Sequence, residues 1–228
     1  MDRRNFVSQG ITAVAGLSLG AMAAENEPES KIIILGVSCS PRKGKTTATS
    51  VKIALEAAQA VSPRIETQLI DLADMKLSGW KGGAKPDAPQ IPFDDYEVNV
   101  EPYFMSPNLG GLIIGSPVYF RTMSAVCKAF LERLYTVRTP VMRLADKPVG
   151  ALAVGSFRNG GQELVIEQIL SAMLCYEPFI VGGKPSAHQG ATLWNNYNDD
   201  ITKDEFGVDT AKKLGIRIAE AALKNAGR

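Results

Sequence analysis

The sequence predicts an α/β protein in which a doubly wound parallel sheet of five strands carries helices on both faces. Apolar runs, several of them rich in β-branched residues, alternate along the chain with longer segments of helical periodicity. Most of these runs lack the polar–apolar alternation of a half-exposed sheet, which is typical of strands buried on both faces. The sequence also contains no internal repeat that would favour a solenoid or a propeller.

Strands and helices are expected in strict alternation. The first strand is the run Ile32–Leu35, and the later strands are expected at 65–70, 109–114, 149–154 and 179–181. Helices are expected at 47–61, 94–106, 122–135, 161–175 and 209–224. The first of these helices places Ala48, Val51, Leu55 and Ala58 at helical spacing.

Two interruptions are visible in this pattern. Pro102 falls inside the second expected helix. Residues 73–92 carry three glycines and three prolines and therefore predict a long loop. Loops of this length within compact domains are usually functional or mobile.

The first strand leads into a loop with the composition of a phosphate-binding turn. The apolar run ends at Gly36, a loop rich in Ser, Pro and Gly follows, and a helix is expected to start at Thr46 or Thr47. The first N–H groups of a helix lack internal partners, and the helix dipole favours an anion there. Hydroxyl and cationic side chains add further donors: Ser38, Ser40, Thr46, Thr47, Arg42, Lys43 and Lys45. The turn is therefore predicted to bind a phosphate, with Ser40 and Thr46 on an exposed loop edge.

A nucleoside-triphosphate loop fits this turn poorly. Gly44-Lys45-Thr46 matches the second half of the G-x-x-x-x-G-K-[ST] pattern, but Cys39 stands where its first glycine should be. A magnesium-binding Asp is also missing after the strand 109–114, which runs into Gly115-Ser116-Pro117. A loop of hydroxyls suits a single terminal phosphate better. For Cys39 itself, a packing role is favoured over a reactive thiol.

Two further loops follow apolar strands, at Gly115–Arg121 and Gly155–Gln162. Ligands of doubly wound sheets bind outside the carboxyl ends of the strands, so the three loops are expected at one edge. Tyr119, Phe120 and Phe157 offer aromatic surface there. The loops therefore predict a flat, phosphate-bearing ligand.

These segments resemble the flavodoxin-like NAD(P)H-dependent FMN reductases, in particular the branch that includes the iron–sulfur flavoproteins. The similar motifs are S-x-S-P-R-x-G-x-T at Ser38–Thr46, G-S-P-V-Y-F at Gly115–Phe120, M-S-A-x-x-K-A-F at Met123–Phe130, G-G-Q-E at Gly160–Glu163, and D-E-F-G…L-G-x-R-x-A-E at Asp204–Glu220. The resemblance implies a flavodoxin-like fold with FMN as cofactor. It implies that the phosphate is held by Ser38, Ser40, Arg42, Gly44, Lys45, Thr46 and Thr47. It implies that Pro117, Val118, Tyr119 and Phe120 line the isoalloxazine, and that its pyrimidine side is covered by Ser156, Phe157, Arg158, Asn159, Gly160 and Gly161.

The chain departs from the iron–sulfur branch in one segment. That branch carries a compact cysteine cluster after the second strand, whereas residues 71–93 contain no cysteine. The resemblance therefore carries over no metal cluster, and no metal site is expected. Residues 94–107 depart as well, and Tyr96, Tyr103 and Phe104 in this segment are either substrate-facing or part of an oligomer contact.

The function expected from these features is FMN-dependent NAD(P)H oxidoreduction, with electrons passing to a small acceptor such as a quinone or a flavin. No catalytic side chain is required, since the flavin carries the hydride chemistry. The alternative is an exported FMN electron-transfer protein that is reduced by a protein partner. We also expect a homo-oligomer, either a dimer or a tetramer. Nothing indicates nucleic-acid binding, because the formal charge is only +1 and no long basic face is present.

The N-terminus resembles a twin-arginine export signal. Arg3-Arg4 precedes a short, weakly apolar stretch at Ile11–Ala24, and Ala21-Met22-Ala23 has the small residues of a cleavage site. Residues 1–30 are therefore expected to be a signal peptide and polar linker, and 31–228 the FMN-binding domain. The protein is expected to be exported to the periplasm, without a stable membrane span after cleavage. The alternative is a membrane anchor formed by the uncleaved N-terminus.

Overall fold

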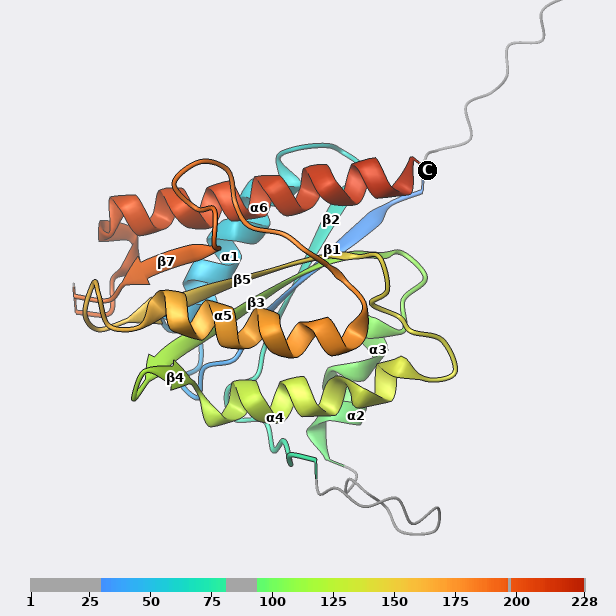
Figure 1. Cartoon of the computed structure of the whole chain (residues 1–228), viewed down its shortest axis with the longest axis horizontal. Helices are drawn as coiled ribbons and strands as arrows, with labels where there is room; N and C mark the ends of the chain where they lie inside the picture. The colour runs from blue at the N-terminus through green and yellow to red at the C-terminus, as the bar shows by residue number, and fades with distance from the viewer. Residues whose placement is uncertain (1–29, 81–93, 197, 228) are drawn as a thin grey trace, which may run out of the picture.

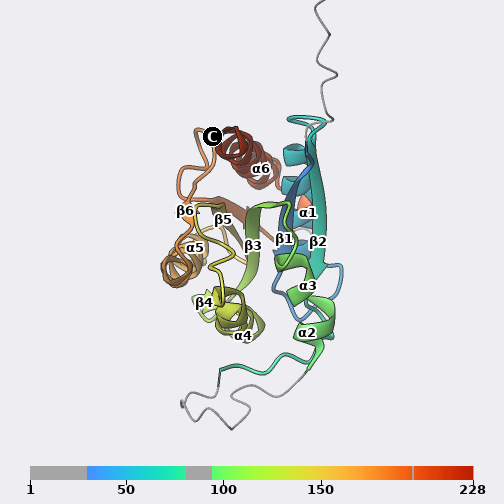
Figure 2. The same cartoon turned by 90° about the vertical axis from the view of Figure 1, so that its right-hand side faces the viewer.

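The parallel strands of the sheet run between the helices (Figure 1), and their order is β2-β1-β3-β5-β6, as Figure 2 shows. The computed structural model describes residues 30–80, 94–196 and 198–227, so the expected signal segment lies almost wholly outside the described residues. The strands are β1 (Ile32–Ser38), β2 (Ile65–Asp71), β3 (Leu109–Tyr119), β5 (Pro148–Gly155) and β6 (Phe179–Ile180). Their parallel pairing and their order confirm the predicted doubly wound α/β fold.

The fifth position of the sheet is divided between two short strands. The pairs Pro148↔Phe179 and Val149↔Ile180 join β6 to the start of β5. A strand that the sequence pattern did not predict, β7 (Ala191–Trp194), pairs with the carboxyl half of β5. A two-residue strand, β4 (Thr122–Met123), folds back antiparallel onto β3 where a helix was expected to begin.

Two hydrophobic cores lie on opposite faces of the sheet. Figure 2 shows α1 (Thr46–Gln59) and α6 (Glu205–Ala226) on one face, and α4 (Ala125–Arg133) and α5 (Gln162–Met173) on the other. Neighbouring strand residues point to different cores, since Ile34 packs with α1 and α6 whereas Leu35 packs with α4 and α5. Short 3-10 helices lie between these elements, at Leu134–Arg138, Leu174–Tyr176 and Ile201–Lys203. None of the helices in the described ranges is both long and apolar enough to cross a membrane.

The helix expected at 94–106 is broken into α2 (Asp95–Asn99) and α3 (Glu101–Phe104). Pro102 lies in the first turn of α3, where its missing N–H costs no hydrogen bond. Tyr96 and Phe104 are completely buried in the core, so neither faces a substrate or a subunit contact. Of the three aromatic residues considered for such a role, only Tyr103 is exposed.

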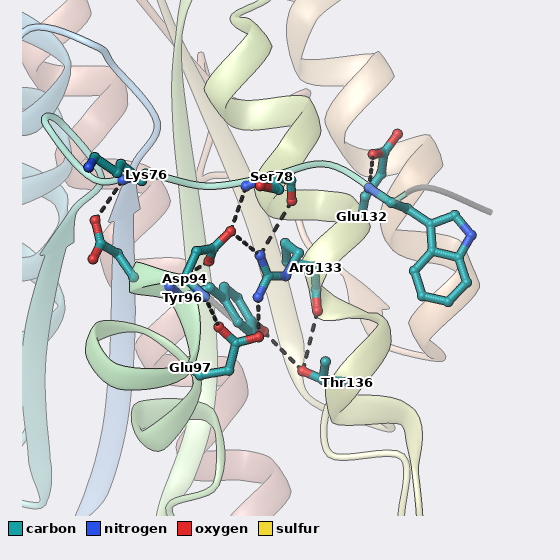
Figure 3. A network of polar contacts seen from close by, with 10 residues as sticks. Lys76, Ser78, Asp94, Tyr96, Glu97, Glu132, Arg133 and Thr136 are labelled. Carbon is teal, nitrogen blue, oxygen red and sulfur yellow. Dashed lines mark hydrogen bonds and ion pairs between the residues drawn. The ribbon is translucent and has the colours of Figure 1, made fainter. Parts of the chain in front are cut away.

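Arg133, the last residue of α4, is a completely buried cation (Figure 3). Its guanidinium forms ion pairs with Asp94, at 2.6 Å, and with Glu97, and it lies 4.7 Å from the ring centroid of Tyr96. Asp94 also accepts the N–H of Ser78, at 2.8 Å, and forms the capping box of α2. The network therefore attaches the residues on both sides of the segment 81–93 to α4.

Candidate functional site

A cavity of about 190 Å³ opens where the carboxyl ends of β1, β3 and β5 meet at one edge of the sheet. Its lining comes from the loop after β1 and the start of α1, from the ends of β3 and β5, and from the segment after β7: Arg42, Thr46, Pro117, Val118, Tyr119, Val154, Gly155, Ser156 and Asn195. Six of these residues are among those predicted from the sequence. The structure therefore brings the three predicted loops together.

The start of α1 is open to a ligand. The helix begins at Thr46, as predicted, and its N-cap residue Lys45 makes no side-chain capping bond. The first turn contains no acidic residue, so its N–H groups present a positive potential to an incoming anion. Gly44 turns the loop with a φ of 62°, and its own N–H donates to Asp71 over 2.9 Å.

The hydroxyl residues of this loop are buried, and the prediction that Ser40 and Thr46 lie on an exposed edge is wrong. All four are at most 2% exposed: Ser38, Ser40, Thr46 and Thr47. The start of the loop is tied to the N-cap of α4, because the carbonyl of Cys39 accepts a hydrogen bond from Ser124 Oγ, at 2.6 Å. Within the loop, the N–H of Arg42 donates to Ser40 Oγ over 3.1 Å.

Ser38, at the end of β1, carries a buried hydroxyl that has no hydrogen-bond partner among residues 30–80, 94–196 and 198–227. Buried hydroxyls are normally paired, because an unpaired one costs about 1–3 kcal/mol. An unpaired hydroxyl beside an uncapped helix start fits a site that is completed by a polar ligand.

The residues after Gly115 continue β3 and form a hairpin with β4. Val118 pairs with Met123 across this hairpin. Pro117, Val118 and Tyr119 line the cavity. Phe120 lies at the tip of the hairpin with a φ of 50°, and its side chain is fully exposed outside the cavity.

Gln162, the first residue of α5, organises the loop from Ser156 to Gly161. Its side chain accepts the N–H of Gly160 over 2.9 Å and donates to the carbonyl of Phe157 over 2.6 Å. Of the six predicted residues in this loop, only Ser156 lines the small cavity. Phe157 points into solvent, with 76% of its surface exposed.

Arg158 turns away from the small cavity. Its guanidinium pairs with the buried Asp204 over 2.7 Å and lies 4.7 Å from the ring centroid of Trp194. Together with Asn159 and Gly161, it lines a neighbouring cavity of about 630 Å³. Arg158 therefore ties the β5–α5 loop to the start of α6.

Cys39 and Cys127 are packing residues beneath the loop between β1 and α1. Both are completely buried in the core between the sheet and α4. Burial, and then a hydrogen bond with Cys127, raises the pKa of the Cys39 thiol well above its usual value. Because the thiolate is the reactive form, the expected packing role of Cys39 is confirmed.

A family model described as NADPH-dependent FMN reductase matches residues 32–191. The chain belongs to the NADPH-dependent FMN reductase family. The match covers all the strands of the sheet up to the start of β7, together with each of the three ligand-edge loops. The chain is accordingly an FMN-dependent oxidoreductase.

Known proteins are similar to this chain in sequence or in fold. It is 36% identical to an iron-sulfur flavoprotein of Methanocaldococcus jannaschii over 82% of this chain and 95% of that protein. It is 32% identical to an iron-sulfur flavoprotein of Methanosarcina thermophila over 84% and 97% of the two chains. The fold is similar to that of a WrbA-like flavodoxin of Agrobacterium tumefaciens (TM-score 0.57, 14% identity, 86% and 99% covered). It is also similar to that of the NADH:FMN oxidoreductase EMOB in its apo form (TM-score 0.56, 22% identity, 85% and 90% covered).

The cysteines of this chain do not fit an iron–sulfur cluster of the kind named in those relatives. The sequence contains only Cys39, Cys127 and Cys175, whereas such clusters are typically held by four cysteines. Two of the three are buried in the core and the third is exposed. Across the described ranges, no group of three or more His, Cys, Asp or Glu side chains is placed to hold a metal ion.

FMN, by contrast, fits the residues present. The uncapped start of α1 and the unpaired Ser38 hydroxyl suit a terminal phosphate. Three cavity residues were not among the predicted site residues: Val154 and Gly155, at the end of β5, and Asn195. The position of Asn195 is the one that no sequence pattern indicated. It follows β7, a four-residue strand that was not predicted, so nothing placed Asn195 at this edge.

Proposed function

We propose that this FMN-dependent oxidoreductase takes a hydride from NADH or NADPH and passes the electrons to a small acceptor such as a quinone or a flavin. The observation that carries the proposal is the cavity in which Arg42 and Thr46, at the start of α1, meet Pro117, Val118 and Tyr119, at the end of β3. Bound FMN supplies the hydride chemistry, so the protein contributes position and electrostatics without an acid or base of its own.

The residues divide by their place around the cavity. The proposed phosphate site consists of the loop and helix start after β1: Ser38, Ser40, Arg42, Gly44, Lys45, Thr46 and Thr47. The proposed isoalloxazine site consists of the end of β3 and the hairpin: Pro117, Val118 and Tyr119 line the cavity, and Phe120 lies at the exposed hairpin tip beside it. The pyrimidine side is assigned to the loop 156–161, where Arg158 acts indirectly by holding the loop against Asp204.

A larger hollow beside Tyr119 supports an apolar acceptor. Its volume is about 1030 Å³, and its lining comes from the β3–β4 hairpin, α4 and α5. Tyr119 lines both this hollow and the small cavity, so a molecule in the hollow lies next to the proposed flavin site. Apolar residues such as Phe120, Met123 and Leu164 suit a quinone ring. The homo-oligomer expected from the sequence also remains part of this proposal.

Steady-state kinetics test whether NADH or NADPH is the electron donor. The purified protein loaded with FMN is expected to oxidise NADH or NADPH when a quinone is added, and heat is expected to release FMN as the main flavin. FAD as the released species would contradict the single-phosphate site. Tight FMN binding without turnover by either nicotinamide would replace this function by the alternative, an exported electron-transfer protein that is reduced by a protein partner.

We also propose export of the folded protein by the twin-arginine route, with the membrane anchor as the alternative. Lysine keeps the charge of arginine but not the guanidinium shape that a receptor reads. Replacing Arg3 and Arg4 by lysine is therefore expected to leave full-length, FMN-loaded protein in the cytoplasm, as measured by cell fractionation and N-terminal sequencing. Lys31→Arg is a matched control outside the signal. Unchanged export of the Lys pair would overturn the proposal, and an intact N-terminus in the membrane fraction would favour the anchor.

A further inference from the structure

Asn195 is held firmly at the ligand edge of the sheet. It directly follows β7, whose last residue, Trp194, is in register with Gly155 of β5. The N–H of Asn195 donates to the carbonyl of Gly155 over 2.8 Å. This bond extends the ladder between the two strands and places Asn195 in the lining of the small cavity.

Asp199 determines which way the Asn195 amide faces. Asn195 Nδ2 donates to Asp199 Oδ1 over 2.9 Å, and Arg42 Nη1 lies 3.0 and 2.9 Å from the two oxygens of the same carboxylate. The hydrogen bonds from Asn195 and Arg42 lower the pKa of Asp199, so its carboxyl is ionised at neutral pH. An ionised carboxylate only accepts hydrogen bonds, so the NH₂ group must face Asp199 and the oxygen must face away from it.

The side-chain oxygen of Asn195 is left without a partner. It is buried and makes no hydrogen bond to any residue in the ranges that the structure describes. A buried amide oxygen in this situation is a strong acceptor for a donor that enters the cavity. The cavity that Asn195 lines is the one in which we place FMN.

We propose that Asn195 accepts a hydrogen bond from a ribityl hydroxyl of bound FMN, and that Asp199 is the positioning residue that keeps the acceptor side of its amide toward the ligand. The proposal rests on the FMN site described above. Thr46, on the phosphate side, and Val118, on the ring side, line the same cavity as Asn195. The ribityl chain of FMN connects the phosphate to the ring and carries hydroxyl groups that donate hydrogen bonds, so it is the part of FMN that we assign to Asn195.

Binding of FMN and its analogues tests the contact directly. Asn195→Ala is expected to weaken FMN binding roughly tenfold, measured by quenching of flavin fluorescence, while Asn196→Ala, at the exposed neighbouring position, leaves it unchanged. The 2′-, 3′- and 4′-deoxy analogues of FMN each lack one ribityl hydroxyl. At least one of them should bind wild-type protein roughly tenfold more weakly than FMN. The same analogue and FMN should bind the Asn195→Ala variant with equal affinity. FMN methylated at N3 is the control analogue: its affinity relative to FMN should be the same for wild-type protein and for Asn195→Ala.

Asp199→Asn tests the positioning role. It removes the acceptor-only partner, so it is expected to weaken FMN binding and to abolish the coupling between Asn195 and the deoxy analogue. Asp200→Asn, on the next carboxylate of the same turn, is the matched control, because among the described residues Asp200 bonds only to Thr202 and Lys203, within its own turn. If Asn195→Ala binds FMN as tightly as wild type, or if Asn195 is coupled to the N3 methyl group instead of a hydroxyl, the contact with the ribityl chain is wrong. Either result would still leave FMN as the cofactor of this site. Failure of the wild-type protein to bind FMN would instead remove the cofactor site itself.

Discussion

Replacing Ser40 and Thr46 together by alanine is expected to weaken FMN binding by about 10²- to 10⁴-fold. Each hydroxyl is proposed to donate to the phosphate, and a hydrogen bond to a charged group contributes roughly 1.5–3 kcal/mol. Both residues are buried beside the uncapped start of α1, so water replaces the lost contacts poorly. Titration of the apoprotein with FMN, followed by flavin fluorescence, measures the change.

The fold is expected to tolerate this double change, because the two hydroxyls are small and, among the described residues, only one side-chain hydrogen bond is lost, from the Arg42 N–H to Ser40 Oγ. Ser62→Ala with Thr49→Ala is the matched control. Ser62 makes the same kind of turn bond, accepting the N–H of Arg64 over 3.2 Å, but lies at the opposite end of α1. Equal loss of FMN affinity in both double variants would show that the effect is global. Unchanged affinity in the Ser40 and Thr46 variant would place the phosphate elsewhere.

The parts of this molecule that the sequence predicts well are those determined by local patterns. Buried strands such as Ile32–Ser38 show as apolar runs, and the start of α1 at Thr46 shows as a change from a polar loop to helical spacing. Because ligands of such sheets bind outside the carboxyl ends of the strands, residues as distant in sequence as Arg42 and Ser156 can be predicted to lie at one site. Topology therefore gives most of the candidate site without any knowledge of side-chain positions.

The features that escape prediction depend on contacts between distant residues. The strand Ala191–Trp194 exists because it pairs with β5, and this pairing carries Asn195 to the ligand edge. Arg158 looks like a ligand residue by position, but Asp204 and Trp194, from later in the chain, draw its guanidinium away. Neither the spacing nor the chemistry of the loop 156–161 reveals these partners.

The burial of Arg133 also depends on distant residues, because its ion-pair partners Asp94 and Glu97 lie far from it in the sequence. From the sequence alone, a charged residue at the end of a helix is expected to be exposed to solvent. Arg133→Met is expected to lower the free energy of unfolding by about 3–5 kcal/mol, because it leaves the carboxylates of Asp94 and Glu97 without their buried partner. Urea unfolding of the apoprotein measures the loss. Lys128→Met is the matched control on the same helix, since Lys128 forms an exposed pair with Glu132 that is worth less than about 1 kcal/mol.

Two further measurements separate the lost charge pairing from simple loss of packing around Arg133. Although burial of its carboxyl alone would raise the pKa of Asp94, hydrogen bonds from the backbone of Tyr96 and Ser78 and from Arg133 hold this pKa below its usual value. A lowered folded-state pKa stabilises the protein above the unfolded value, about 3.9, and the contribution is lost as the pH falls through the folded value. The difference between wild type and Arg133→Met should therefore shrink in acid. Adding Asp94→Asn and Glu97→Gln to Arg133→Met should restore part of the stability at neutral pH, and a triple variant no more stable than Arg133→Met would show that packing, not charge, is what the arginine supplies.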